Sequence, residues 1–144
     1  MRGKSVRSKA IRKLDAVFSK YIRRRDCGYG YAPCISCGKP ITYDTSDCGH
    51  YENRQHMATR YDEKNCNAQC IECNRFRGGN SEGYRLGLIE KYGESEVEKI
   101  EMRRYNLSKL SVPEIEMLYK HYKGKLTNLE NTLKQAQSVE DYRG

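Results

Sequence analysis

Two Cys-x-x-Cys pairs constrain this chain more than any other feature of its sequence. The pairs are Cys34/Cys37 and Cys70/Cys73, and 32 residues separate them. Each pair places two thiols on one side of a tight turn, and two such turns can complete a tetrahedral site of four sulfur ligands. Zinc suits this ligand set, because it accepts four thiolates and needs no redox chemistry. The sequence therefore predicts a zinc ion held by Cys34, Cys37, Cys70 and Cys73.

A zinc ion with four protein ligands is structural, since no coordination position remains for water or substrate. The total of seven cysteines is odd, which favours metal binding in a reducing compartment over disulfides. Cys27, Cys48 and Cys66 have no paired spacing, and we expect them to be buried as small apolar side chains. Any catalytic residues are therefore expected in the segment between the two pairs.

Positive charge is concentrated at the start of the chain. Residues 1–25 contain ten of the 27 Lys and Arg residues and one of the 19 acidic residues, so the net charge of +8 comes from this segment. Concentrated positive charge attracts polyanions, and nucleic acid is the polyanion expected in a cytoplasm. A solvated helix face that only keeps a protein soluble would give the same pattern. The candidate DNA contacts are Arg12, Lys13, Lys20, Arg23 and Arg24.

Apolar residues recur at helical spacing in two long segments. In residues 7–25 they are three or four apart, with basic residues between them, which predicts an amphipathic helix. Ser111-Val112-Pro113-Glu114 combines a cap, an early proline and a capping-box glutamate, and predicts a helix that reaches about residue 137. We expect its apolar seam to pack on the first helix, with a coiled-coil homodimer as the alternative. The seam residues are Tyr119, Tyr122, Leu126, Leu129, Leu133 and Ala136.

Shorter elements and the domain boundaries follow from turn and cap signals. Ser81 is the predicted cap of a helix over 82–92 that ends at Gly93, and a second helix fits 94–104. At most a hairpin of strand is expected around 41–52. We divide the chain into a basic helix (1–26), a zinc-framed core (27–80), C-terminal helices (81–137) and a frayed tail (138–144).

Length and hydropathy limit the fold and its location. The chain has 144 residues, of which 37% are apolar, and this suits one compact domain that a metal helps to stabilise. No run approaches the roughly 18–20 consecutive apolar residues of a membrane span. The basic start at Met1-Arg2-Gly3-Lys4-Ser5 has no apolar stretch after it, so we expect a soluble, cytoplasmic protein.

The segment between the cysteine pairs contains residues suited to phosphodiester hydrolysis. His50 is followed by Asn65, and Asn74 comes directly after the second pair. Hydrolysis needs a base that deprotonates water, and a neutral imidazole can fill this role near neutral pH. It also needs a divalent cation at the phosphate and the leaving oxygen. A single histidine is more often structural than catalytic, so it is the ordered set of three residues that indicates a site.

This order, framed by two Cys-x-x-Cys pairs, resembles the HNH (His-Me finger) nucleases and, within them, the endonuclease VII group. More closely, the chain is similar to the phage NinG/Rap recombination protein family over most of residues 8–135. The resemblance implies a mainly α fold, with a small zinc-framed ββα-metal insert in a single compact domain. The matching stretches are Cys34–Gly38, Gly49–Tyr51, Arg60–Asn65, Gln69–Asn74 and Gly79-Asn80.

The resemblance implies a structure-specific endonuclease that acts on Holliday junctions or D-loops in a bacterial host, with Mg²⁺ or Mn²⁺ as its catalytic cation. His50 takes the position of the general base, Asn65 that of the residue that orients the His-bearing loop, and Asn74 that of a metal ligand. Many HNH sites have an Asp before the base as a second ligand, whereas this chain has Gly49. Asp47 or His56 can supply that ligand, and His50 itself is a further candidate.

Two other classes of function compete with this interpretation. A non-catalytic zinc-stabilised DNA-binding recombination protein would share the cysteines and the basic segment, but it would not need His50 or Asn74. An accessory factor that binds other recombination proteins through the C-terminal seam is the third reading. The expected partners are branched DNA, a possible second copy of the chain, and no membrane.

Overall fold

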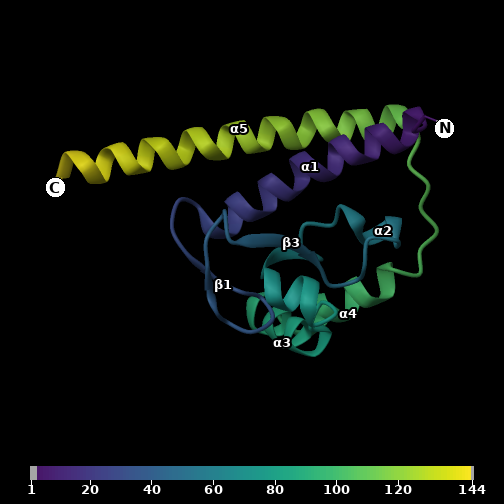
Figure 1. The fold of residues 1–144 in the computed structure, drawn as a ribbon, viewed down its shortest axis with the longest axis horizontal. Helices are drawn as coiled ribbons and strands as arrows, with labels where there is room; N and C mark the ends of the chain where they lie inside the picture. Colours follow the sequence, from purple (N-terminus) through teal and green to yellow (C-terminus); the bar gives the residue numbers. More distant parts are fainter. Residues whose placement is uncertain (1–2, 144) are drawn as a thin grey trace.

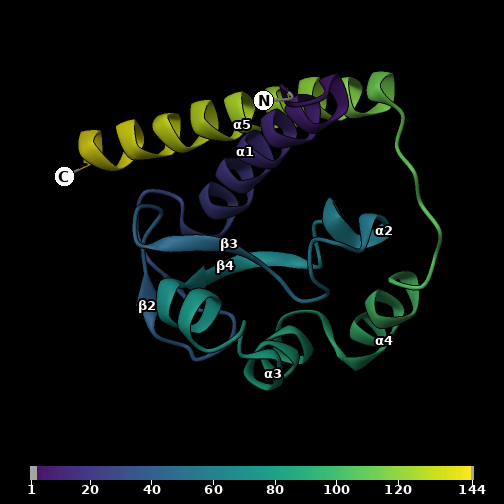
Figure 2. The ribbon, with the colours of Figure 1, turned by 45° about the vertical axis from the view of Figure 1, so that its right-hand side comes forward.

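Helix α1 (Val6–Cys27) lies between a long C-terminal helix and a small antiparallel sheet (Figure 1). This computed structural model describes residues 3–143. Helix α5 (Val112–Arg143) packs along one side of α1, and strands β3 (Ser46–His50) and β4 (Cys66–Cys70) pack on the other. Figure 2 shows the same three layers after a rotation, with the remaining short helices around the far side of the sheet.

The amphipathic pattern of residues 7–25 forms α1 as predicted. Its N-terminus is capped by Ser5, whose hydroxyl accepts a hydrogen bond from the Ser8 amide at 3.1 Å. Leu14, Phe18 and Ile22 are fully buried on one face, where they meet both α5 and the sheet. Since a single helix covers two neighbours, α1 is the main apolar contributor to the core.

Two antiparallel strand pairs hold the cysteines. Strand β1 (Ala32–Pro33) pairs with β2 (Pro40–Ile41), and the turn between them carries the first Cys-x-x-Cys pair. In the second sheet Ser46 of β3 lies opposite Cys70 of β4, and His50 lies opposite Cys66. The strand at 46–50 falls within the predicted hairpin region, but its partner β4 was not predicted.

Four short helical segments complete the fold beyond the sheet. The predicted helix after residue 81 is present and Gly93 ends it, but its cap is Asn80 rather than Ser81. Asn80 adopts a left-handed conformation (φ 43°), which asparagine tolerates, and its side-chain oxygen accepts from the Gly83 amide at 3.4 Å. The four segments are α2 (Met57–Arg60), the π-helical turn η1 (Glu72–Phe76), α3 (Ser81–Tyr92) and α4 (Glu94–Arg103).

The capping box predicted for α5 is present. The Glu114 amide donates to the Ser111 hydroxyl and the Ser111 amide donates to the Glu114 carboxylate, both at 3.3 Å. The predicted end of this helix near residue 137 is wrong, because α5 continues to Arg143. Residues 134–143 contain no glycine or proline, so nothing in the sequence stops the helix there.

The apolar seam of α5 packs on α1 of the same chain, as predicted. Tyr122 is buried in the core, and Leu126 and Leu129 pack against it. Farther along, a Cβ placed at Gly28 would meet Leu133 Cδ2 at 3.7 Å, so the contact follows α1 to its end. Ala136, the last residue of the seam, is exposed.

The resulting molecule is mainly helical and forms a single compact domain. Its apolar core joins α1, α5 and β4, and two smaller clusters surround the cysteines and α3. Among the helices within residues 3–143, none combines the length and the hydropathy needed to cross a bilayer.

Candidate functional site

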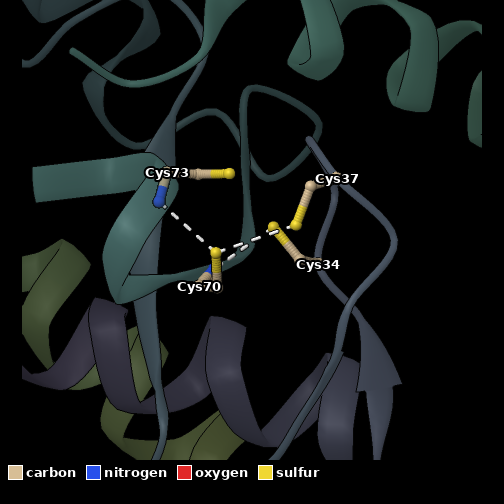
Figure 3. A group of neighbouring side chains, drawn as sticks. All are labelled: Cys34, Cys37, Cys70 and Cys73. Carbon is tan, nitrogen blue, oxygen red and sulfur yellow. Dashed lines mark hydrogen bonds between the residues drawn. The ribbon is translucent and has the colours of Figure 1, made fainter. Parts of the chain in front are cut away.

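The four cysteines of the two Cys-x-x-Cys pairs lie together in the structure (Figure 3). Their Sγ atoms are all within 4.8 Å of one another, and those of Cys37 and Cys70 are 3.8 Å apart. Cys34 and Cys37 come from the turn between β1 and β2, whereas Cys70 ends β4 and Cys73 lies in η1. Three of the four side chains are buried, and Cys37 is exposed.

This arrangement fits a zinc ion. Zinc–sulfur bonds of about 2.3 Å in a tetrahedron place the sulfurs about 3.8 Å apart. Amide groups donate to the sulfurs, from Cys70 to Cys34 at 3.2 Å and from Cys73 to Cys70 at 3.3 Å. Burial alone would raise the pKa of Cys34, but backbone hydrogen bonds from Cys70, Cys37 and Ser36 outweigh it and lower the pKa. The cluster can therefore hold zinc, as predicted from the spacing.

An open groove of about 770 Å³ lies beside this centre. Helix α1, strand β3, the loop after β3 and the turn η1 all contribute to its walls. Four of the predicted site residues line it: Asp47, His50, His56 and Asn74. Asn74 thus shares one solvent-accessible space with Asp47, which lies 27 residues before it in the sequence.

Asp47 is the focus of a polar cluster in this groove. Its carboxylate accepts from the Asn74 side-chain amide at 2.9 Å and from Arg75 through two hydrogen bonds of 2.8 Å. Burial alone would raise the pKa of Asp47, but the hydrogen bonds from Arg75 and Asn74 outweigh it and lower the pKa. The structure therefore pairs an ionised carboxylate with the amide that follows the last cysteine of the metal centre.

His50 lies at the end of β3 with one ring nitrogen already engaged. Its Nε2 is 2.9 Å from the carbonyl oxygen of Arg60, which can only accept, so Nε2 carries the proton. Burial and the nearby positive charges of Arg54 and Arg60 lower the pKa of His50 to about 4. At neutral pH the ring is therefore uncharged, and Nδ1 retains its lone pair.

Asn65 lies outside the groove and is completely buried. Its side-chain oxygen accepts from the Glu52 amide at 2.8 Å, and its side-chain amide donates to the carbonyls of Glu52 and Thr59, both at 3.0 Å. These bonds tie both ends of the loop that follows His50. Because Arg60 comes directly after Thr59, they also fix the carbonyl that His50 contacts.

Gly49, where the resemblance leads one to look for an acid, has no room for a side chain. A Cβ at this position would lie 2.1 Å from Gln69 Oε1. Gln69 is itself held, because its amide donates to the Ser36 hydroxyl at 2.8 Å and to the Gly79 carbonyl at 2.6 Å. The position before His50 therefore requires glycine, because the Gln69 side chain of β4 occupies the space that an Asp side chain would need.

Asp15 is a site residue that the sequence analysis missed. It accepts from the Arg60 guanidinium at 3.1 and 2.5 Å and from the Tyr61 hydroxyl at 2.7 Å, and it lines the groove. These contacts anchor the loop after His50 to α1. The available signal was that Asp15 is the single acid among the ten basic residues of the N-terminal segment.

The five candidate DNA contacts on α1 divide into two groups. Arg12, Lys13 and Lys20 are exposed. Arg23 donates to the Tyr43 carbonyl at 3.0 Å, and Arg24 donates to the Gly28 carbonyl at 2.7 Å, so both are held within the protein. The first group is accessible to a polyanion, with Lys13 Nζ also lying over the Tyr119 ring at 4.3 Å from its centroid, whereas the second supports the C-terminal end of α1.

The fold and the site together define a mainly helical, single-domain protein with a four-cysteine cluster that can hold a metal. Within that class the chain belongs to the NinG family, since the family model described as Bacteriophage Lambda NinG protein matches residues 3–132. No solved structure significantly matches the chain.

Several curated phage proteins are similar to this chain. Protein ninG of Escherichia phage 933W is 34% identical over 131 residues, and the alignment covers 90% of this chain and 63% of that protein. The ninG proteins of Escherichia phage lambda and Salmonella phage P22 are each 33% identical, again over 90% of this chain and 62% of theirs. The chain thus spans somewhat under two thirds of the length of these relatives.

Proposed function

We propose that this protein is a divalent-metal-dependent endonuclease of the HNH class that cuts branched DNA, such as Holliday junctions and D-loops, during phage recombination. One observation carries the proposal. A neutral, oriented His50 and the Asp47–Asn74 pair line the same groove, directly beside a cysteine cluster able to hold zinc. The resemblance of this ordered set to the HNH nucleases supplies the reaction class.

His50 is the general base in this proposal. Its Nε2–H is donated to the Arg60 carbonyl, so Nδ1 is the atom that takes a proton from the attacking water. Asn65 and Asp15 act as positioning residues, because they hold the loop that presents this carbonyl. Their effect on the reaction passes through the orientation of the imidazole.

Asp47 and Asn74 are the proposed ligands of the catalytic cation. Mg²⁺ prefers oxygen ligands and keeps several waters, so one carboxylate and one amide oxygen are sufficient. A bound Mg²⁺ or Mn²⁺ would stabilise negative charge on the phosphate and on the leaving oxygen. Asn74 would turn its amide oxygen, rather than its nitrogen, toward the site.

The zinc centre has a structural role in this proposal. Cys73 directly precedes Asn74, and Cys70 ends the strand that pairs with β3. Four thiolates around zinc would therefore fix the backbone of η1, which carries Asn74, and of β4, which positions β3 beside it. The basic face of α1 would bind DNA phosphates, since Arg12 lies one turn before Asp15 at the groove.

Cutting both strands of a junction requires two catalytic sites, so we propose that two chains act together on one junction. A dimer with two-fold symmetry would place two copies of His50 on the two strands. Sedimentation of the protein–junction complex should show two chains bound to one junction. A complex that contains one chain and still nicks both strands at the same time would contradict this arrangement.

The test compares wild type, His50→Ala and His121→Ala on linear duplex, single-stranded, D-loop and four-way DNA, with and without Mg²⁺. His121 is an exposed histidine on α5 far from the groove in sequence, and it serves as the matched control. Cleavage by His50→Ala should fall by about two or more orders of magnitude, the usual scale for loss of a general base. Zinc content, melting temperature and junction affinity should stay close to wild type.

Cleavage of junctions by His50→Ala at the wild-type rate would overturn the proposal. Absence of any cleavage by wild type would instead favour the second candidate, a non-catalytic zinc-stabilised protein that binds DNA through the exposed basic residues of α1. In that case wild type and His50→Ala should bind junctions equally and neither should cut.

A further inference from the structure

A second cluster of metal-binding side chains lies on the inner face of the sheet. The ligand atoms of Cys48, His50 and Cys66 are all within 4.8 Å of one another. None of these thiols belongs to a Cys-x-x-Cys pair, and both are free. The cluster is therefore separate in sequence and composition from the four-cysteine centre.

The strand register brings these three residues together. Cys48 and His50 are two residues apart on β3, so their side chains point to the same face of the sheet. Cys66 lies directly opposite His50 on β4. Its sulfur is 3.5 Å from the Arg60 carbonyl, the same oxygen that His50 contacts at 2.9 Å. The two strands thus bring three potential ligand atoms within 4.8 Å of one another.

The surroundings of this point favour a soft metal over a hard one. Cys66 is completely buried in the apolar core, and Cys48 packs against that core while also lining the groove. A divalent ion bound by two thiolates and a neutral imidazole forms a complex with no net charge, which such a site can accommodate. Thiolates and imidazole are ligands for Zn²⁺ and similar ions, whereas Mg²⁺ takes oxygen ligands.

We propose that Cys48, His50 and Cys66 form a second site for a thiophilic divalent cation, of the chemical class of Zn²⁺ or Cd²⁺. The groove gives the ion access from the side of Cys48 and His50. Three protein ligands leave a fourth position for water, as in open zinc sites.

Occupation of this site would switch off the base, a consequence that rests on the proposed nuclease function. A neutral imidazole has one free lone pair, whichever of its nitrogens carries the proton. That lone pair can bind a metal or accept a proton from water, but it cannot do both. The site is therefore inhibitory, and it acts on the residue that the reaction needs.

The first experiment counts metal ions on the intact protein. Zinc-loaded protein is incubated with excess Cd²⁺ under a phosphine reductant, desalted, and assayed for total zinc plus cadmium. Wild type should retain about two ions per chain, one for each cluster. Cys48→Ala should retain about one. Cys27→Ala removes a buried thiol that belongs to neither cluster, and it should retain the wild-type count.

Cys48 is the position to change because it is only half-buried, whereas loss of the buried Cys66 thiol can also disturb the core. A thermal melt of each variant establishes that it is folded before the ions are counted. A single ion on folded wild type, or an unchanged count in Cys48→Ala, would overturn the proposed site.

The second experiment measures cleavage at saturating Mg²⁺ while Cd²⁺ is increased, with each protein normalised to its own rate without Cd²⁺. Wild type and Cys27→Ala should lose more than about tenfold, whereas Cys48→Ala should resist. Equal inhibition of all three would mean that Cd²⁺ acts elsewhere, and would overturn the inhibitory role. If wild type does not cut DNA at all, the proposed function fails and the ion count alone decides the metal site.

Discussion

Asn74 owes its position to the residue before it. Cys73 fixes the backbone of η1 in the metal centre, and the Asn74 amide then reaches Asp47 at 2.9 Å. His56 lines the same groove, but among residues 3–143 its side chain makes no hydrogen bond with either of these two. Between Asp47 and His56 as the second ligand, the geometry therefore favours Asp47.

Metal rescue tests this choice at the level of single residues. Asp47→Ala and Asn74→Ala should both reduce cleavage, and high Mg²⁺ or Mn²⁺ should restore part of the loss if these side chains bind the cation. His56→Ala is the matched comparison from the same groove, and it should cut without needing extra metal. Rescue of His56→Ala but not of Asp47→Ala would reverse the assignment. Asn65→Ala should be milder than His50→Ala, since it misplaces a loop and leaves the reacting group in place.

The pKa of His50, lowered to about 4, predicts how the cleavage rate depends on pH. The ring stays neutral well below pH 6.5, so single-turnover cleavage should hold its rate from about pH 7 to about pH 5.5, provided zinc content is unchanged. An acid limb with an apparent pKa near 6.5 would contradict this.

The lowered pKa of His50 should also make the free energy of unfolding depend on pH. The unfolded chain takes up a proton on His50 near pH 6.5, whereas the folded protein takes it up near pH 4, so acid favours unfolding between these values. His50→Ala removes this penalty, and its free energy of unfolding should fall less than that of wild type over the same range. Chemical denaturation at several pH values measures the difference, and parallel curves for the two proteins would contradict it.

At the scale of elements, the basic residues of α1 form an exposed group that can bind phosphate and a second group that forms hydrogen bonds within the protein. Changing Arg12, Lys13 and Lys20 together to Gln should weaken binding to all DNA sequences alike. The slope of log affinity against log salt should fall by roughly 0.9 for each lost phosphate contact. Unchanged affinity and slope would mean that this face is only solvated charge.

Arg23 and Arg24 provide the contrast within the same helix. Their guanidinium groups donate to backbone carbonyls and lie over the Tyr43 ring, at 4.3 and 3.8 Å from its centroid. Changing both to Gln should lower the melting temperature more than the salt slope, since these contacts stabilise the protein itself. Thermal melts beside the salt titrations separate the two effects.

Helices α1 and α5 were predictable from their repeating apolar patterns, with Ser111 marking the start of α5, and α3 from its end at Gly93, whereas the short segments α2 and η1 were not predicted. Strand β4 was not predictable, because its sequence, Cys-Asn-Ala-Gln-Cys, alternates without an exposed side and every residue is buried. Asn67 and Gln69 can be buried there because their side-chain amides form hydrogen bonds with specific partners. Such partners come from distant segments, so the sequence of the strand alone gives no sign of them.

The residues of the candidate site were predictable in kind but not in arrangement. The cysteine spacing was enough to predict the four-sulfur cluster, since short turns fix each pair locally. The pairing of Asp47 with Asn74 and the anchoring of the loop by Asp15 depend on the packing of α1, β3 and η1. These contacts span 27 and 45 residues, and no local signal specifies them.

At the scale of the whole molecule, the four-cysteine cluster joins the turn between β1 and β2 to strand β4 and the turn η1. We expect about one tightly bound zinc per chain in addition to any ion at the second cluster. Cys34→Ser or Cys70→Ser should lose this zinc together with the folded structure, whereas Cys27→Ala should keep both. Elemental analysis and circular dichroism check this, and a folded, active preparation without zinc would contradict it.

The placement of α1 between its two neighbours has a consequence for the newborn chain. All four cysteines of the metal centre lie within the first 73 residues, whereas the cover for α1 begins only at Val112. During synthesis the sulfur cluster can close while the apolar side of α1 is still bare on the ribosome. Translation thus leaves an interval in which Leu14 and Phe18 lack their contacts with α5, and this interval ends when α5 has been made.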